Sequence, residues 1–175
     1  MPLNSERLII RPLEVKDAEA YSKLGCSYRS TGPIDNPKKA KQYIKKSLKS
    51  EDSFDVGIFL KDSNEMIGTI ELCHMKWFNF KAGEICYTIH QDHWGKGFAT
   101  EATKAFIDYC FKEMNFRKVY ADTVPDNVGS QKVLEKLNFT LEGTIRERHF
   151  KDGKWIDELD YGLLRDEWEK EINTD

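Results

Sequence analysis

The sequence predicts a single α+β domain over residues 1–175, in which helices flank a central mixed sheet. Predicted strands outnumber predicted helices in the middle of the chain. Two strand–helix–strand crossovers, near residues 84–124 and 118–149, require parallel strands, so the sheet should not be purely antiparallel. A chain of 175 residues is long enough to bury one substantial core.

The N-terminal third predicts a strand, two helices and the loop between the helices. Leu8 to Leu13 is an apolar strand that a proline stops, and Val15 to Leu24 carries apolar residues at helical spacing. Residues 31–37 contain a glycine and two prolines, which indicates a loop. A longer helix then begins at a cap near Asn36, with a proline at its start, and ends at about Ser50.

Six lysines lie within residues 38–49 of this longer helix. They have two interpretations, an RNA-binding face or a solvated surface. The whole chain carries a net charge of −3 and therefore offers no general attraction to nucleic acid. We favour the solvated surface.

The middle of the chain predicts a hairpin and a third strand. Phe54 to Leu60 and Met66 to Met75 are strands around a turn at residues 61–64. After a turn at Gly83, a strand runs from Glu84 to His90. Its side chains alternate between an apolar face and a polar face: Ile85, Tyr87 and Ile89 on the first, and Glu84, Cys86, Thr88 and His90 on the second.

The remaining elements follow from the same periodicities. In order, they are a helix from Phe98 to about Cys110, a strand from Lys118 to Thr123, a helix from Asn127 to Leu137, strands at about Thr140–His149 and Trp155–Leu164, and a helical turn around Trp168.

A tight glycine turn joins the strand Glu84 to His90 to the helix at Phe98. Gly95 and Gly97 let the backbone turn sharply, and the helix that follows presents unpaired N–H groups and the positive end of its dipole. This arrangement predicts an anion site that suits a phosphate or pyrophosphate. It is neither a P-loop nor a dinucleotide fingerprint, because His90 and Thr100 stand where those motifs need glycines. A turn that uses glycine for geometry alone is the alternative.

Three blocks of the sequence resemble the GNAT acetyltransferases. Trp94 to Ala102 resembles their acetyl-CoA pyrophosphate loop in the form typical of the Rim-type branch, which acts on ribosomal-protein N-termini. Asp126 to Phe139 resembles the family's N-x-x-S helix and its closing G-F, with Asn138 in place of the glycine. Residues 142–157 resemble the C-terminal hairpin of that branch. The family loop usually begins with glutamine or arginine, and Asp92 stands there instead.

The resemblance implies a mostly antiparallel sheet whose middle strands splay apart, so that free backbone groups bind the pantetheine arm of acetyl-CoA. It places the coenzyme on Ile89, His90, Trp94, Gly95, Lys96, Gly97, Phe98, Ala99, Thr100, Asn127 and Ser130. It also implies that the Ser130 hydroxyl protonates the departing thiolate, whereas Leu134 stands where polyamine acetyltransferases of the superfamily often carry an acid tyrosine. The alternatives are that Ser130 caps its helix and that Asn127 is a plain N-cap.

The acceptor amine determines how strong a base is needed. Freeing a protein α-amine at pH 7 costs about 1.4 kcal/mol, against roughly 4.6 kcal/mol for a lysine-like amine. Glu84, on the polar face of its strand, is one candidate base, with a surface salt bridge as the alternative role. His149 is the other candidate, because an imidazole suits proton transfer near neutral pH.

The sequence thus predicts an acetyl-CoA-dependent N-acetyltransferase that acts on a protein or peptide N-terminus by direct attack. One alternative is the acetylation of a small amine, a polyamine or an aminoglycoside. A polyamine site would want clustered carboxylates near the acceptor, and the lysine-rich helix argues against them. A non-catalytic acyl-CoA-binding sensor is the other alternative.

Further expectations concern partners and compartment. The cysteines, Cys26, Cys73, Cys86 and Cys110, form no C-x-x-C pair, so we expect no metal and no disulfide, and a cytoplasmic protein. No apolar run approaches the roughly 20 residues of a membrane span, and the N-terminus lacks signal-peptide character. The aromatic segment Trp77 to Phe80 should wall the acceptor cleft or a homodimer interface, with packing over a satellite core as the alternative.

Overall fold

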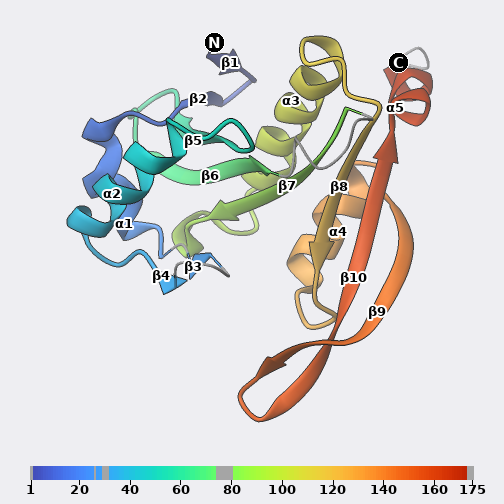
Figure 1. The fold of residues 1–175 in the computed structure, drawn as a ribbon. Helices are drawn as coiled ribbons and strands as arrows, with labels where there is room; N and C mark the ends of the chain where they lie inside the picture. Colours follow the sequence, from blue (N-terminus) through green and yellow to red (C-terminus); the bar gives the residue numbers. More distant parts are fainter. Residues whose placement is uncertain (1, 26, 29–31, 74–80, 173–175) are drawn as a thin grey trace.

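The computed structural model describes residues 2–25, 27–28, 32–73 and 81–172. Its main sheet has eight strands, which lie side by side in this order: β1 (Leu3–Asn4), β2 (Leu8–Pro12), β5 (Phe54–Leu60), β6 (Met66–Cys73), β7 (Ala82–Ile89), β8 (Lys118–Thr123), β10 (Lys154–Leu164) and β9 (Thr140–Lys151). Two short strands, β3 (Ser27–Tyr28) and β4 (Gly32–Pro33), pair separately. Figure 1 shows the sheet with its flanking helices.

The sheet is mixed and mostly antiparallel, as the sequence predicts. Its one parallel pair in the described residues is β7 with β8, which the first predicted crossover connects. The second crossover leads from β8 to β9, and β10 lies between these two strands and is antiparallel to both. Both predicted crossovers are therefore present.

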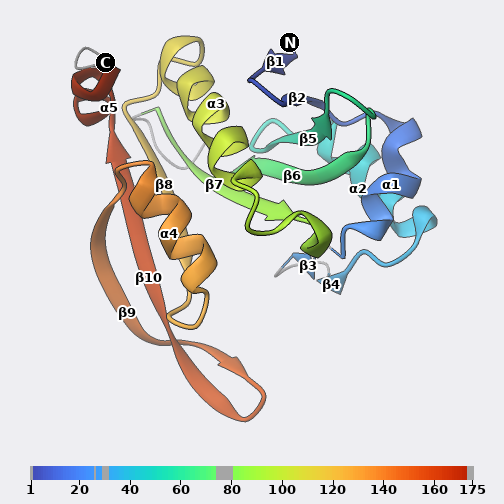
Figure 2. The ribbon, with the colours of Figure 1, turned by 180° about the vertical axis from the view of Figure 1, so that it is seen from behind.

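The five α-helices of the described residues cover the sheet from two sides (Figures 1 and 2). They are α1 (Ala18–Lys23), α2 (Pro37–Ser47), α3 (Phe98–Lys112), α4 (Val128–Lys136) and α5 (Arg165–Ile172). The larger core lies beneath α3 and includes Ile85, Phe106 and Val119, all nearly inaccessible to solvent. A smaller core lies beneath α1 and α2 and includes Tyr21 and Ile44. We call the two sides of the sheet the α3/α4 face and the α1/α2 face.

Strands β7 and β8 separate along their length. They pair at Ala82, Gly83 and Glu84, opposite Lys118, Val119 and Tyr120. Beyond this point β7 stays paired with β6 as far as Ile89, and β8 stays paired with β10 as far as Thr123. The two central strands therefore splay apart in the middle of the sheet, as the family resemblance implies.

Local sequence explains several element boundaries. Asn36 caps α2 by accepting a hydrogen bond from the Lys39 N–H at 3.0 Å, and Pro37 begins the helix as predicted. The helix ends at Ser47 rather than Ser50, because the Ser50 hydroxyl accepts hydrogen bonds from the next turn instead. The first predicted helix starts with a 3₁₀ turn before α1. The aromatic segment Trp77 to Phe80 and the predicted end of its strand at Met75 lie outside the described residues.

The lysines of α2 are exposed, and its opposite side is packed. Ala40 and Ile44 are fully buried, and the Tyr43 ring stacks on Tyr21 with centroids 5.5 Å apart. Helix α2 is therefore amphipathic and presents its lysines to solvent, a position that both interpretations of these lysines require. No helix within the described ranges is long and apolar enough to cross a membrane.

Candidate active site

A cavity of about 220 Å³ lies between the splayed ends of β7 and β8. Because side chains alternate along each strand, residues of both sheet faces line this splay cavity. Its lining residues are Ile85, Cys86, Tyr87, Ala121, Asp122, Thr123, Val124, Asn127 and Ser130. The cavity therefore connects the α3/α4 face to the α1/α2 face through the sheet.

On the α3/α4 face, two hydroxyl groups meet at the wall of the cavity. The Tyr87 phenol lies 2.8 Å from the Ser130 hydroxyl and donates to the Ser130 carbonyl oxygen at 3.2 Å. Burial raises the pKa of Tyr87 to about 12, so the phenol keeps its proton at neutral pH. The pair is thus a chain of neutral proton donors that borders the cavity.

Asn127, rather than Ser130, caps α4. The Asn127 side-chain oxygen accepts a hydrogen bond from the Ser130 N–H at 3.1 Å. The alternative that Ser130 serves as the helix cap is therefore wrong, and its hydroxyl is directed to Tyr87 instead. Asn127 does act as an N-cap, and it also lines the cavity. Leu134 is fully buried in the core and offers no proton donor.

The glycine turn has the backbone geometry of an anion site. Gly95 and Gly97 have φ angles of +72° and +81°, in the left-handed region that favours glycine, and Gly97 is the residue before α3. The N–H groups of the first helical turn have no partner within the helix. A side chain at Gly95 would meet nothing within 4 Å, and one at Gly97 would meet only Arg7, at 3.5 Å. The loop therefore leaves open space above its amides, where a phosphate would fit.

Arg7 links the start of β2 to this turn. Its guanidinium pairs with Glu101 at 2.7 Å, donates to the Lys96 carbonyl oxygen at 3.1 Å, and lies over the Phe98 ring. Burial opposes ionisation of Glu101, but hydrogen bonds from Arg7 and Ser5 lower its pKa overall. The negative charge of Glu101 in the first turn of α3 is thereby compensated, and the helix N-terminus stays suited to an anion.

The remaining predicted coenzyme residues surround the same turn. Trp94 donates from its indole nitrogen to the Ile89 carbonyl oxygen at 2.6 Å, and the His90 N–H donates to the Ile67 carbonyl oxygen. These two backbone groups are therefore already bonded, and the backbone that borders the cavity belongs to residues 85–87 and 121–124. Lys96 is exposed, and its ammonium group donates to the Asp92 carbonyl oxygen. Ala99 and Thr100 are half-buried in the first turn of α3.

Carboxylates form a row across the α1/α2 face of the sheet. The register places Asp55 opposite Glu71 and Glu71 opposite Cys86, with Glu84 next to Cys86 along β7. Burial, followed by the negative charges of Asp55 and Glu84, raises the pKa of Glu71 to about 7. Burial also raises the pKa of Asp55. The lysine-rich helix therefore does not exclude clustered carboxylates, because strand register rather than helix α2 determines the charge of this face.

The row continues on β8 and the C-terminal hairpin. His149 lies 2.7 Å from the buried carboxylate of Glu158, and ligand atoms of Asp122, His149 and Glu158 all lie within 4.8 Å of one another. Asp122 borders the splay cavity on the same face as Glu84. The structure thus places both predicted base candidates, Glu84 and His149, on one face, with Asp122 on β8, one of the two strands between theirs.

Sequence reasoning missed three residues of this region. Tyr87 carries a hydroxyl group on a strand face that is otherwise apolar. We interpreted this side chain as part of the core and gave its hydroxyl group no role. Asp122 shares the less buried face of β8 with Tyr120, and its position relative to His149 depends on the long C-terminal hairpin. Arg7 lies 94 residues from Glu101 in the sequence and carries no local signal at all.

Comparison with known proteins places this geometry in a family. Residues 7–140 match the acetyltransferase (GNAT) domain. The chain is 32% identical over 174 residues to an uncharacterized N-acetyltransferase, p20, of Bacillus licheniformis, covering 95% of this chain and 97% of the relative. It is 30% identical over 120 residues to the ribosomal protein uS5-alanine N-acetyltransferase of Escherichia coli, covering 69% and 62%.

A solved structure agrees with these matches. The ribosomal-protein-S5-alanine acetyltransferase of Vibrio fischeri superposes with a TM-score of 0.83 at 25% identity, over 96% of this chain and 98% of that chain. The similarity therefore extends over nearly the whole fold.

Proposed function

The chain belongs to the GNAT family and is an N-acetyltransferase, and on that premise we propose that its acceptor is a protein or peptide N-terminal α-amine. The observation that carries the proposal is the splay cavity, which joins the hydroxyl pair on one face of the sheet to the carboxylates on the other. Acetyl-CoA, the acetyl donor of the family, approaches from the α3/α4 face, and the amine from the α1/α2 face.

The coenzyme fits the residues of the α3/α4 face. The amides at the start of α3 suit its pyrophosphate, because they are unpaired and lie behind two left-handed glycines. The polar backbone bordering the cavity suits the amides of the pantetheine arm, and a backbone N–H there would stabilise an oxyanion by roughly 3 kcal/mol. Asn127 and Ser130 border the same cavity and suit its reactive end.

Proton transfer in this proposal runs from one face to the other. Glu84 or His149, through an ordered water, accepts the proton of the attacking amine on the α1/α2 face. Ser130 gives its hydroxyl proton to the departing thiolate on the α3/α4 face and takes the Tyr87 phenol proton in its place, and solvent in the cavity then returns a proton to Tyr87. A weak base suffices for an α-amine, because freeing it at pH 7 costs only about 1.4 kcal/mol.

The relatives and the row of carboxylates favour different acceptors. A relative at 30% identity is named for a ribosomal-protein N-terminal alanine, which supports the α-amine. The carboxylates of Asp55, Glu71, Glu84 and Asp122 favour a cationic acceptor, so a polyamine is the second candidate. A peptide with basic residues after its N-terminus would also satisfy this charge.

A competition assay with labelled acetyl-CoA tests the acceptor class. Peptides with a free N-terminus are compared with the same peptides blocked by formylation, and with spermidine, spermine and an aminoglycoside. We expect turnover of free peptides, faster when basic residues follow the N-terminus, and none of blocked peptides. Higher kcat/KM for spermidine than for any peptide would overturn the first candidate, and coenzyme binding without any turnover would overturn both.

Two further proposals concern assembly and compartment. We place the protein in the cytoplasm, where Cys73, Cys86 and Cys110 would remain the free thiols that they are in the structure. We also propose a homodimer, supported by the long exposed edge strand β9 and the two exposed aromatic rings near the hairpin tip.

A further inference from the structure

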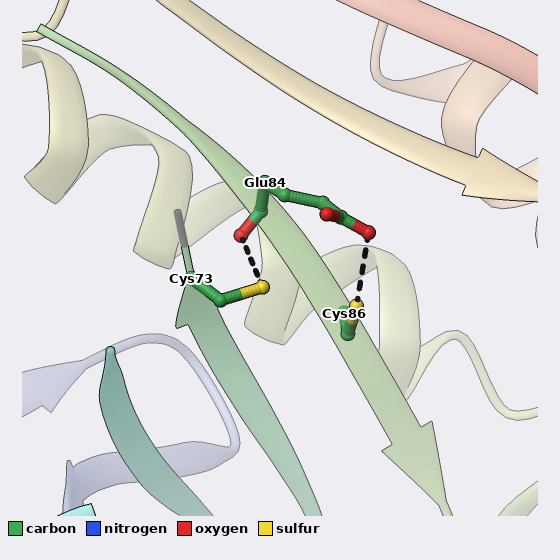
Figure 3. A group of neighbouring side chains, drawn as sticks. All are labelled: Cys73, Glu84 and Cys86. Carbon is green, nitrogen blue, oxygen red and sulfur yellow. Dashed lines mark hydrogen bonds between the residues drawn. The ribbon is translucent and has the colours of Figure 1, made fainter. Parts of the chain in front are cut away.

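Two cysteines and a glutamate converge on the α1/α2 face where β6 pairs with β7. Cys73 and Glu84 are directly opposite in the register, and Cys86 follows Glu84 by two residues, so all three side chains share one face. Figure 3 shows the Glu84 carboxylate reaching along β7 to Cys86. The two sulfur atoms and a carboxylate oxygen all lie within 4.8 Å of one another.

We propose that Cys73, Cys86 and Glu84 bind a Zn²⁺ ion. Two thiolates and a carboxylate are donors that zinc accepts, and three protein ligands leave one position for water. Zinc–sulfur and zinc–oxygen bonds of about 2.3 Å and 2.0 Å place the donors of a tetrahedron roughly 3.5–3.8 Å apart. The contact of 3.6 Å from Cys86 Sγ to Glu84 Oε1 is already close to that scale, and Cys73 Sγ lies within 4.8 Å of the other two donors.

The surroundings of these ligands favour a cation. Glu71 lies opposite Cys86, and the Asp122 carboxylate acts on the Cys86 thiol from β8. The neighbouring Cys73 thiol, burial and the charge of Glu84 raise the pKa of Cys86. Burial and the charges of Asp55 and Glu84 act in the same direction on Glu71. Binding of Zn²⁺ releases the two thiol protons and therefore leaves the net charge of the group unchanged, while it places a divalent cation directly against the Glu84 carboxylate.

The same two thiols invite a disulfide, but the structure favours zinc. Cys73 and Cys86 are diagonal neighbours on their strands rather than direct partners. Diagonal neighbours on paired strands lie roughly 7–8 Å apart, which exceeds the Cα separation that a disulfide usually spans. A zinc ion bridges a longer separation, because its two Zn–S bonds hold the sulfur atoms about 3.8 Å apart.

Zinc at this position would also inhibit acetyl transfer. Glu84 is one of the two candidate bases, and a carboxylate bound to zinc accepts no proton from an amine. This consequence rests on the proposed function, whereas zinc binding itself does not.

Metal binding can be measured without any assay of activity. The reduced protein is treated with a chelator and desalted, and Zn²⁺ is titrated against a chromophoric chelator. Co²⁺ is titrated separately, because thiolate ligands give it a charge-transfer band in the near ultraviolet. We expect one equivalent of metal, a thiolate band, and a loss of affinity of at least about 100-fold in Cys73→Ser and in Cys86→Ser.

Two variants make the test specific. Cys110→Ser removes the buried thiol of α3, far from the site, and should bind metal as the unaltered protein does. Glu84→Gln keeps both thiols and should weaken binding while the thiolate–cobalt band remains. Thermal melting checks that each variant is folded. No thiolate band in the reduced protein, or equal affinity in Cys73→Ser, would overturn the proposal.

Two other outcomes are informative. In the first, protein purified without reductant lacks two titratable thiols and is lighter by the mass of two hydrogens, which shows a disulfide. If the reduced form of that protein also binds no zinc, the zinc site is overturned. If zinc binds as expected but does not inhibit acetyl transfer in the unaltered protein, the role of Glu84 as base is contradicted and the metal site stands. Inhibition should be absent in Cys73→Ser.

Discussion

Ser130 and Tyr87 provide the sharpest prediction at the scale of single residues. Ser130→Ala should lower kcat by roughly ten- to a hundred-fold with little change in acetyl-CoA affinity, because a proton donor to the leaving group acts mainly in the transition state. Tyr87→Phe should lower kcat by a smaller factor, because Ser130 keeps its own hydroxyl. Steady-state kinetics and coenzyme titration measure both effects. Equal turnover in Ser130→Ala would remove this serine from the chemistry.

The glycine turn predicts a loss of coenzyme affinity that depends on backbone geometry. Gly97→Val should raise the KM for acetyl-CoA at least about ten-fold, because a β-branched residue avoids a φ of +81° and intrudes where phosphate approaches the amides. Gly97→Asn should be milder, since asparagine tolerates the left-handed region.

Gly153 offers a matched control for that strain. Its φ is +77°, and a side chain there would meet nothing within 4 Å, but it lies in the β9–β10 turn. Gly153→Val should therefore lower the melting temperature without changing the KM for acetyl-CoA. Should Gly97→Val behave in the same way, the pyrophosphate assignment would be lost.

Glu71 predicts a stability effect with a defined pH dependence. Its pKa is raised from 4.5 to about 7, so the folded state holds this proton more tightly than the unfolded chain does. Ionisation therefore destabilises the fold progressively as pH rises from about 4.5 to 7. Glu71→Gln removes the effect and should raise the free energy of unfolding by about 1–2 kcal/mol at pH 8 and hardly at pH 4, after allowance for partial exposure.

Denaturant unfolding at the two pH values tests this expectation. Exposed Glu113, at the end of α3, provides the control substitution Glu113→Gln, which should change stability little at either pH. If Glu71→Gln raised the free energy of unfolding equally at both pH values, the charge of the carboxylate would not be the cause of the increase.

At the scale of elements, periodicity and turn chemistry predict the bounds and caps of individual helices and strands. The bounds of β5 and β8 are as predicted, the Asn36 cap and Pro37 begin α2, and Asn138 has the left-handed φ of 58° that replaces the family glycine. Each of these depends on neighbours in the sequence. Strands β1, β3 and β4 have two residues each and are too short for any alternation to show.

What the sequence could not provide is the register between elements. Asp55, Glu71 and Cys86 form a row because β5, β6 and β7 align at those residues, and a shift of one residue would move side chains to the other face. The Tyr87–Ser130 pair likewise depends on how α4 packs against β7. Motifs predicted the coenzyme residues, whereas the charge of the α1/α2 face required the structure.

At the scale of the whole molecule, the proposed function assigns a separate task to each face of the sheet. The α3/α4 face carries the glycine turn and the hydroxyl pair, and the α1/α2 face carries the carboxylates. The splay of β7 and β8 is the passage between them, and the long β9–β10 hairpin brings His149 and Glu158 to the acceptor side. The hairpin also extends beyond the rest of the sheet (Figure 1), so its outer part packs against little of its own chain.

This hairpin supports the last prediction, that two copies associate through it. Strand β9 spans 12 residues at the edge of the sheet, and nearly all of its side chains are exposed. Phe150 and Trp155 face each other across the hairpin, 63% and 61% exposed, and Ile145 is 40% exposed. A long open edge with exposed apolar side chains is a template for a second strand, and a second copy of the chain offers the same edge.

Light scattering coupled to size exclusion measures the oligomeric mass. The unaltered protein should have the mass of a dimer, and Phe150→Ser combined with Trp155→Ser should shift it toward the monomer, because these rings lose their apolar contact area. Leu48→Ser, which removes a 56% exposed side chain just after α2, should leave the dimer intact. Acetyl-CoA affinity should not change in either variant, since the predicted coenzyme residues lie on other elements. A monomeric mass for the unaltered protein at micromolar concentration would exclude the homodimer, and the open edge of β9 would then need protection by its twist and its charged side chains alone.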